Sequence, residues 1–132
     1  MIVDTSALVA ILKSEPEARH FRDRLRDASE PVTISSASLL EAGIVIDGGK
    51  DSILSAQLDE IISDFAIIVA PFTEAQSRLA REAYRQYGKG TGHPAQLNFG
   101  DCFAYALAVD TDQPLLFKGE DFAKTDVKIA SV

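Results

Sequence analysis

The chain has 132 residues, of which 46% are hydrophobic and 25% are charged. This length and apolar content predict one compact domain over residues 1–132, large enough to bury a core without disulfide bonds. Its 13 basic and 20 acidic side chains give a net charge of −7, which argues against a broad electrostatic contact with nucleic acid or anionic lipid, though not against a local one.

The composition excludes two further classes of protein. The single cysteine, Cys102, cannot form an internal disulfide or a cysteine-rich zinc site, and we expect it to be a core residue rather than a nucleophile. No apolar run reaches the ~18 residues of a membrane span, and the first residues lack the basic start of a secretory signal. We therefore expect a soluble, cytoplasmic protein without a membrane partner.

The N-terminal half alternates short β-prone runs with helical segments. The apolar run at 1–3 predicts a buried strand that ends at Asp4, and a helix follows through Leu12. Ser14 is the predicted N-cap of a second helix, because Pro16 is typical of a first helical turn. Three further elements are expected in this order: a strand at 32–35, a helix from 35 or 36 to 46, and a helix at 51–64.

The C-terminal half continues this alternation. The run 66–70 is strongly β-prone, and Thr73 is the predicted N-cap of a helix over 73–87. The glycine- and proline-rich segment 88–96 predicts a loop. The remaining predicted elements are a helix at 98–109 and short strands at 115–117 and 127–130.

Strands that alternate with helices indicate βαβ units, and therefore a mainly parallel sheet with helices on both faces. In such sheets, ligands bind beyond the carboxyl ends of the strands. Asp4 directly follows the first predicted strand, so it is the first candidate for a functional residue.

Three acidic residues are isolated among uncharged residues. Each is the only charged side chain of its stretch when His93 is neutral: Asp4 in 1–12, Glu41 in 31–46 and Asp101 in 90–109. Burying an ionised carboxylate without a partner costs several kcal/mol. A shared cation at one end of a parallel sheet would compensate all three, and oxygen ligands select hard ions such as Mg²⁺ or Mn²⁺.

Each of these acids also has a structural interpretation. Asn98 with Asp101, and Ser38 with Glu41, have the spacing of a capping box, in which the acid accepts a hydrogen bond from the N-cap backbone. Asp4 would, in the same way, accept backbone N–H bonds at the start of the following helix. The residues alone leave both interpretations open.

A fourth acid, Asp121, follows the predicted fourth strand in the segment FKGEDF and would reach the same edge of the sheet. Its neighbour Glu120 competes for that place, and a solvated turn is the structural alternative. Lys89, Lys118 and Lys124 flank this edge, either as contacts for a polyanion or as solvated surface.

Four segments together resemble the PIN-domain family and, within it, the VapC ribonuclease toxins of bacterial toxin–antitoxin pairs: IVDTSAL, SLLEAGIVI, LNFGDCFAYALA and LLFKGEDF. They span essentially the whole chain in the family's order. The resemblance implies a PIN-like three-layer α/β sandwich, with a five-stranded parallel sheet of order 3-2-1-4-5 flanked by helices. It also implies a homodimer, a cognate VapB-type antitoxin, and Mg²⁺-dependent endoribonuclease activity on tRNA, rRNA or mRNA, with Mn²⁺ as a substitute.

Carried over residue by residue, the resemblance places the family's first three acids at Asp4, Glu41 and Asp101, and implies that Asp4 and Asp101 hold one metal ion. Many relatives carry a further acid two residues before the aspartate of the DF pair, where this chain has Gly119. Asp121 is therefore the predicted fourth acid, and occupancy of a second metal site is in doubt.

The implied chemistry is hydrolysis, in which the cation activates water for in-line attack on an RNA phosphodiester and leaves 3′-OH and 5′-phosphate ends. Thr5 and Ser6, next to the first acid, are expected to line the same site. Neutralising the four acids would change the net charge from −7 to −3, which would let RNA approach. The alternative is a catalytically silent PIN-fold module that only binds protein.

Overall fold

The computed structural model describes residues 1–130, so the last two residues of the predicted domain lie outside the described part. Its elements, in chain order, are β1 (Ile2–Val3), α1 (Thr5–Leu12), α2 (Ala18–Arg26), β2 (Thr33–Ser35), α3 (Ser36–Gly48), α4 (Ser52–Asp64), β3 (Ile68–Ala70), α5 (Glu74–Tyr87), α6 (Asp101–Asp110), β4 (Leu115–Leu116) and the 3-10 helix η1 (Phe122–Lys124). None of the helices within residues 1–130 combines the length and the apolar character needed to cross a membrane.

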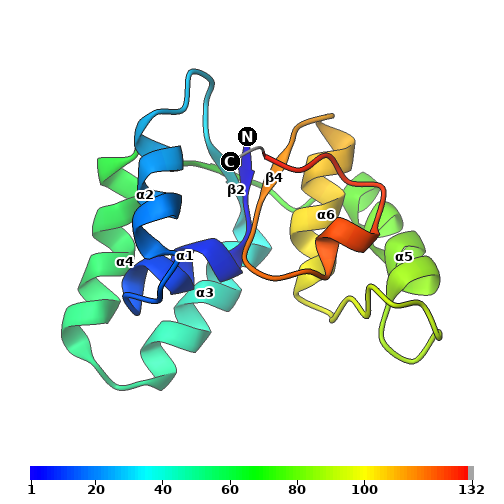
Figure 1. Ribbon diagram of the computed structural model, residues 1–132, viewed down its shortest axis with the longest axis horizontal. Coiled ribbons are helices and arrows are strands. Elements are labelled where there is room, and N and C mark those ends of the chain that lie inside the picture. The colour runs from blue at the N-terminus through cyan, green and yellow to red at the C-terminus, as the bar shows by residue number, and fades with distance from the viewer. Residues whose placement is uncertain (131–132) are drawn as a thin grey trace.

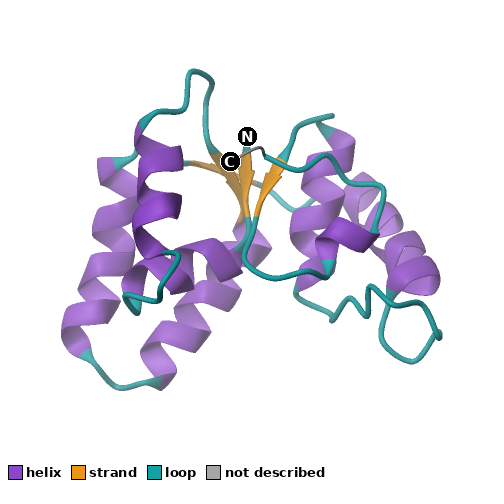
Figure 2. Ribbon diagram, viewed as in Figure 1, coloured by secondary structure: helices purple, strands orange, loops and turns teal. Residues whose placement is uncertain are grey.

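The strands form one parallel sheet in the order β3-β2-β1-β4 (Figure 2). Ile2 pairs with Thr33 on one side and with Leu115 on the other, and Thr33 pairs with Ile68. β1 is therefore an interior strand, and its carboxyl end leads directly into Asp4 in the middle of the sheet edge.

Helices cover both faces of this sheet, with α1 to α4 on one side and α5 and α6 on the other (Figure 1). Successive strand residues point to opposite faces. Val3 and Leu116 therefore pack in the core formed with α1 to α4, whereas Ile2 and Leu115 pack with α5 and α6. A parallel sheet between two helical layers agrees with the predicted α/β class.

The predicted fifth strand at 127–130 is wrong, because a single parallel bridge between Leu115 and Ile129 stands in its place. The chain just before it is held in a turn, since Val127 N–H donates to the side-chain oxygen of Thr125 (3.2 Å). Within residues 1–130, this segment pairs with β4 only through that bridge. The sheet of the described residues thus has the order 3-2-1-4 rather than 3-2-1-4-5, with the bridge on the outer side of β4.

The helix predicted to begin at Ser14 begins at Ala18, and Ser14 instead terminates α1. Its backbone is left-handed, with a φ of 52°. Ser14 N–H donates to Ile11 O (3.2 Å) and Glu15 N–H donates to Ala10 O (2.9 Å), which are the two hydrogen bonds of a Schellman C-cap. A serine close to a proline therefore ends a helix here rather than starting one.

Other boundaries differ by two or three residues from those expected. β3 starts at Ile68 rather than at residue 66, because Ala66 has a left-handed backbone (φ 49°). α6 starts at Asp101 rather than at residue 98. The N-cap predicted at Thr73 is confirmed, since its hydroxyl accepts a hydrogen bond from Gln76 N–H (3.1 Å).

Candidate active site

Asp4 lies where β1 ends and α1 begins. As the N-cap of α1, it accepts hydrogen bonds at Oδ2 from the backbone N–H (3.0 Å) and the hydroxyl (2.6 Å) of Ser6. The residue is only 3% exposed, and its Oδ1 has no hydrogen-bond partner among the described residues. An unpaired buried polar atom costs about 1–3 kcal/mol. The capping interpretation of Asp4 therefore accounts for one carboxylate oxygen and leaves the other unexplained.

Two of the four acids predicted from the sequence, Asp4 and Asp101, have raised pKa values. Burial raises the pKa of Asp4 to about 7 despite the hydrogen bonds from Ser6, and the charges of Asp101 and Glu41 contribute to the increase. Burial likewise raises the pKa of Asp101, with contributions from the charges of Glu41 and Asp121. The contacts bring the same residues together. The Glu41 carboxylate lies against Gly100, which precedes Asp101. Ser6 joins Asp4 to Lys118, in the loop that carries Asp121.

Glu41 belongs to α3, and its carboxylate lies against Gly100 at the start of α6. The N-cap of α3 is Ser35, so Ser38 is inside the helix and cannot cap it. The capping-box interpretation of Ser38 and Glu41 is therefore wrong. Glu41 makes no side-chain hydrogen bond within residues 1–130, which leaves its carboxylate without a structural role of that kind.

The reciprocal hydrogen bonds expected of Asn98 and Asp101 are present, but they span the turn before α6, whose N-cap is Gly100 rather than Asn98. Asn98 N–H donates to Asp101 Oδ2 (2.9 Å), and Asp101 N–H donates to Asn98 Oδ1 (2.8 Å). This reciprocal pair fixes the start of α6 and uses only one of the two carboxylate oxygens. The cap and a second role at the other oxygen are compatible.

Asp121 follows β4 and precedes η1, where its exposed side chain makes no capping hydrogen bond. Its charge is among those that raise the pKa of Asp101. Gly119 has a φ of 100°, a left-handed conformation that favours glycine. This turn gives a physical reason for glycine where the resemblance implies an acid.

The donor set fits a hard divalent cation. All four side chains are carboxylates, the ligand type that Mg²⁺ and Mn²⁺ prefer, and Asp4 Oδ1 is a buried acceptor without a partner in the described part of the chain. In residues 1–130, no lysine or arginine forms a salt bridge with any of the four. No three acids, histidines or cysteines of this region are grouped tightly enough to enclose an ion as they stand, so binding requires side-chain rotation.

Of the two polar neighbours expected to line the site, Ser6 contacts an acid and Thr5 does not. Besides donating to Asp4, the Ser6 hydroxyl accepts a hydrogen bond from the backbone N–H of Lys118 (2.9 Å). The Thr5 hydroxyl is buried and donates to the carbonyl oxygen of Ser38 (2.8 Å), so it joins α1 to α3. Sequence reasoning missed the second bond of Ser6, because it joins segments far apart in the chain.

Two lysines expected near the acids have different surroundings. The ammonium group of Lys118 pairs with Glu15 and with Glu17 (3.1 Å), so it is neutralised within the fold. Lys89 is exposed, and its charge lowers the pKa of Asp101. Lys89 is therefore the better candidate for a contact with a polyanion.

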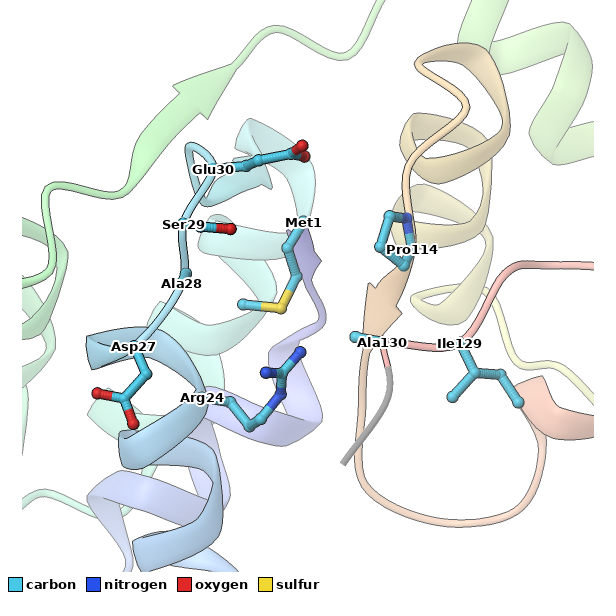
Figure 3. Close-up of a pocket in the computed structure, with 9 residues that line it drawn as sticks. All are labelled: Met1, Arg24, Asp27, Ala28, Ser29, Glu30, Pro114, Ile129 and Ala130. Carbon is cyan, nitrogen blue, oxygen red and sulfur yellow. The ribbon is translucent and has the colours of Figure 1, made fainter.

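Two other features have no part in this site. Cys102 is buried, and burial raises the pKa of its thiol to about 11, in agreement with a core residue. A cavity of about 230 Å³ is lined by Met1, Arg24 and Pro114, among others (Figure 3). It lies beside the residues that precede β1 and β4, whereas Asp4 follows β1, so it is at the opposite end of the sheet.

Comparisons with known proteins place this geometry in a family. The PIN domain profile matches residues 1–128. Ribonuclease VapC28 of Mycobacterium tuberculosis is 52% identical over 130 residues, which cover 98% of this chain and 97% of that protein.

Two solved structures are similar in fold. One is Mycobacterium tuberculosis VapC20, described as a Sarcin-Ricin loop cleaving toxin, with a TM-score of 0.76, 14% identity and coverage of 98% of this chain and 97% of that chain. The other is a toxin–antitoxin complex from Klebsiella pneumoniae, with a TM-score of 0.72, 16% identity and coverage of 98% and 95%. Since the profile match and the 52% identity both extend over nearly the whole chain, this protein belongs to the PIN-domain family and, within it, to the VapC ribonucleases.

Proposed function

We propose that this chain is a metal-dependent endoribonuclease and the toxin of a toxin–antitoxin pair, with Asp4, Glu41, Asp101 and Asp121 as its catalytic acids. One observation carries the proposal: a buried, unpaired oxygen of Asp4 lies among acids whose charges raise the pKa of that residue. Unneutralised buried charge opposes folding and favours a bound cation. The 52% identity to a named ribonuclease supports the same activity.

Asp4 and Asp101 are the proposed ligands of a Mg²⁺ ion, for which Mn²⁺ is a substitute. Asp4 offers Oδ1, and Asp101 offers the oxygen that is not used in its cap with Asn98. A bound divalent cation lowers the pKa of water and stabilises the negative charge that develops on a phosphodiester under attack.

The remaining groups position atoms and accept protons. Ser6 holds Asp4 Oδ2 and so fixes the orientation of that carboxylate. Glu41 and Asp121 make no side-chain hydrogen bond or salt bridge within the described residues, and they are the proposed groups that orient the attacking water and accept its proton. Attack by water on phosphorus, with the ribose 3′ oxygen as the leaving group, breaks the P–O3′ bond and leaves 3′-OH and 5′-phosphate ends.

The proposed substrate is a tRNA, rRNA or mRNA. The net charge of −7 repels a polyanion, and a bound divalent cation would offset two of the four acidic charges at the site. Lys89 lies on an exposed loop and close enough to lower the pKa of Asp101, so it is the proposed contact for the phosphate backbone.

A VapB-type antitoxin is the proposed inhibitor. A segment that blocks this site must compensate the same carboxylates, and an arginine does so with charge-assisted, bidentate hydrogen bonds. The similarity in fold to a chain of a toxin–antitoxin complex supports a partner of this class.

A homodimer is the proposed assembly. A groove of about 380 Å³ next to Glu41 is lined by an apolar surface, which comprises Leu40, Ile44, Phe99 and Phe103. Leu40, Ile44 and Phe99 are 65%, 64% and 76% exposed. A contiguous exposed apolar surface is typical of a protein interface.

The test is RNA cleavage by the purified chain in Mg²⁺, in Mn²⁺ and in a chelator, with Asp4→Asn as the matched variant. We expect the wild type to cleave only with a divalent cation and Asp4→Asn to be inactive. A catalytically silent PIN module would leave RNA intact under every condition, which would overturn the proposal.

A further inference from the structure

Gly100 is the N-cap of α6, and its backbone does not require glycine. Its φ of −66° and ψ of −34° are helical values that any residue adopts. A side chain would nevertheless collide with its surroundings. A Cβ atom on Gly100 would lie 1.8 Å from Oε2, 2.5 Å from Cδ and 2.8 Å from Oε1 of Glu41. The carboxylate of Glu41 thus occupies the volume that a side chain at position 100 would fill.

For other glycines of the described chain, an added Cβ atom does not collide with a carboxylate. Gly90, Gly92 and Gly119 have φ values between 85° and 100°, so the backbone explains them. Gly48, inside α3, would place a Cβ in open space. The close approach of a carboxylate is therefore a particular feature of Gly100, and it concerns one of the four proposed catalytic acids.

The consequence of a side chain at position 100 follows from how Glu41 is held. Glu41 makes no side-chain hydrogen bond or salt bridge within residues 1–130, and it is only half-buried. If a Cβ atom were added at position 100, the flexible end of the Glu41 side chain would therefore move more easily than the backbone of α6. With alanine at position 100, the Glu41 carboxylate would rotate away from its present place against the residue that directly precedes Asp101.

We infer that Gly100 is a positioning residue for the proposed reaction: its missing side chain creates the space that holds the Glu41 carboxylate at the start of α6, where Asp101 lies. This inference rests on the proposed function of Glu41. It predicts that Gly100→Ala acts entirely through Glu41, so the fold persists while the contribution of this acid is lost.

A double-mutant cycle tests the inference, with Gly100→Ala, Glu41→Ala and the combined variant compared with wild type. We expect each single variant to lower the rate of RNA cleavage by about 100-fold, and the combined variant also by about 100-fold. Independent effects would instead multiply to about 10,000-fold. The affinity of the metal-free proteins for Mn²⁺, measured calorimetrically, should fall equally in all three variants.

The matched control is Gly48→Ala, the same substitution inside a helix where the new Cβ meets no atom within 4 Å. It should cleave RNA and bind Mn²⁺ as the wild type does. A second arm combines Gly100→Ala with Glu41→Asp, whose shorter side chain withdraws from the new Cβ, and we expect it to cleave faster than Gly100→Ala alone.

The outcomes separate this inference from the proposed function. Wild-type cleavage by Glu41→Ala would overturn the role of Glu41, and the inference with it. Loss of cleavage in Glu41→Ala together with a wild-type rate in Gly100→Ala, or with multiplicative losses in the combined variant, would overturn the inference alone.

Discussion

The hydroxyl group of Ser6 donates a hydrogen bond to Asp4 over 2.6 Å and accepts one from the backbone N–H of Lys118 over 2.9 Å. Asp4 follows β1, and Lys118 lies in the loop that follows the neighbouring strand β4. One hydroxyl therefore fixes both the orientation of a buried carboxylate and the distance between the ends of two strands. Asp121 belongs to the same loop, so Ser6 also restrains the segment that carries the proposed fourth acid.

Ser6→Ala should weaken both the fold and the site. It removes one donor to Asp4 Oδ2 and one acceptor for Lys118 N–H, so we expect the free energy of unfolding to fall by about 1–2 kcal/mol. Urea denaturation of the metal-free protein measures this. Ser63→Ala, on the exposed face of α4, is the control and should remain within about 0.5 kcal/mol of wild type. An equally small change in Ser6→Ala would show that the bridge contributes nothing to stability.

The stability of the metal-free protein should depend on pH through Asp4. The pKa of this residue is about 7 in the folded protein, against an ordinary value of 3.8. Between these values the folded state binds more protons than the unfolded state, so the free energy of unfolding decreases as pH rises from about 4 to about 7. Denaturation in a chelator across this range measures the slope.

Asp4→Asn is the control for this pH dependence, because asparagine does not titrate. Its decrease in stability over the same pH range should be smaller than that of wild type. Parallel curves for the two proteins would contradict a raised pKa at Asp4 and, with it, the proposal that burial of this carboxylate favours a bound cation.

Glu41→Gln should separate function from folding. The carboxylate makes no hydrogen bond or salt bridge within residues 1–130, so its charge contributes little to the fold, and its removal relieves repulsion with Asp4 and Asp101. We expect the metal-free variant to be at least as stable as wild type, while RNA cleavage falls by about two orders of magnitude or more. Full cleavage by the variant would make Glu41 part of the architecture only.

Expression in cells tests the proposed role as a toxin. The chain produced alone should slow growth, whereas the chain produced with its antitoxin, or Asp4→Asn produced alone, should not. Immunoblotting establishes matched protein levels. Equal growth of cells that express wild type and Asp4→Asn without antitoxin would contradict this role.

The sequence was most informative where a single charge interrupts an apolar stretch. Asp4 follows an apolar run whose residues form the centre of the sheet, so its burial was predictable from these neighbours. The cost of burying a charge there then indicated a functional role. The reciprocal cap of Asn98 and Asp101 was predictable too, because a capping box joins residues three positions apart.

Features that depend on distant contacts or on alternative local structures were not predictable. The pairing of Lys118 with Glu15 and Glu17 joins segments at opposite ends of the chain. The Glu41 carboxylate occupies the space beside Gly100 only when α3 and α6 are packed together in the fold. Ser14, close to Pro16, fits the residue pattern of a helix start. Its left-handed backbone nevertheless ends α1, because a serine close to a proline is compatible with the end of a helix as well as with its start.

Calorimetric titration of the metal-free protein with Mn²⁺ tests most directly whether these acids form a metal centre. Asp4→Asn and Asp101→Asn are the informative variants, and Asp112→Asn, an exposed acid paired with Lys128, is the control. We expect wild type and Asp112→Asn to bind with equal affinity and the two site variants to lose most of it. Undiminished affinity for Mn²⁺ in Asp4→Asn, or no binding of Mn²⁺ to wild type, would contradict a metal centre formed by these acids.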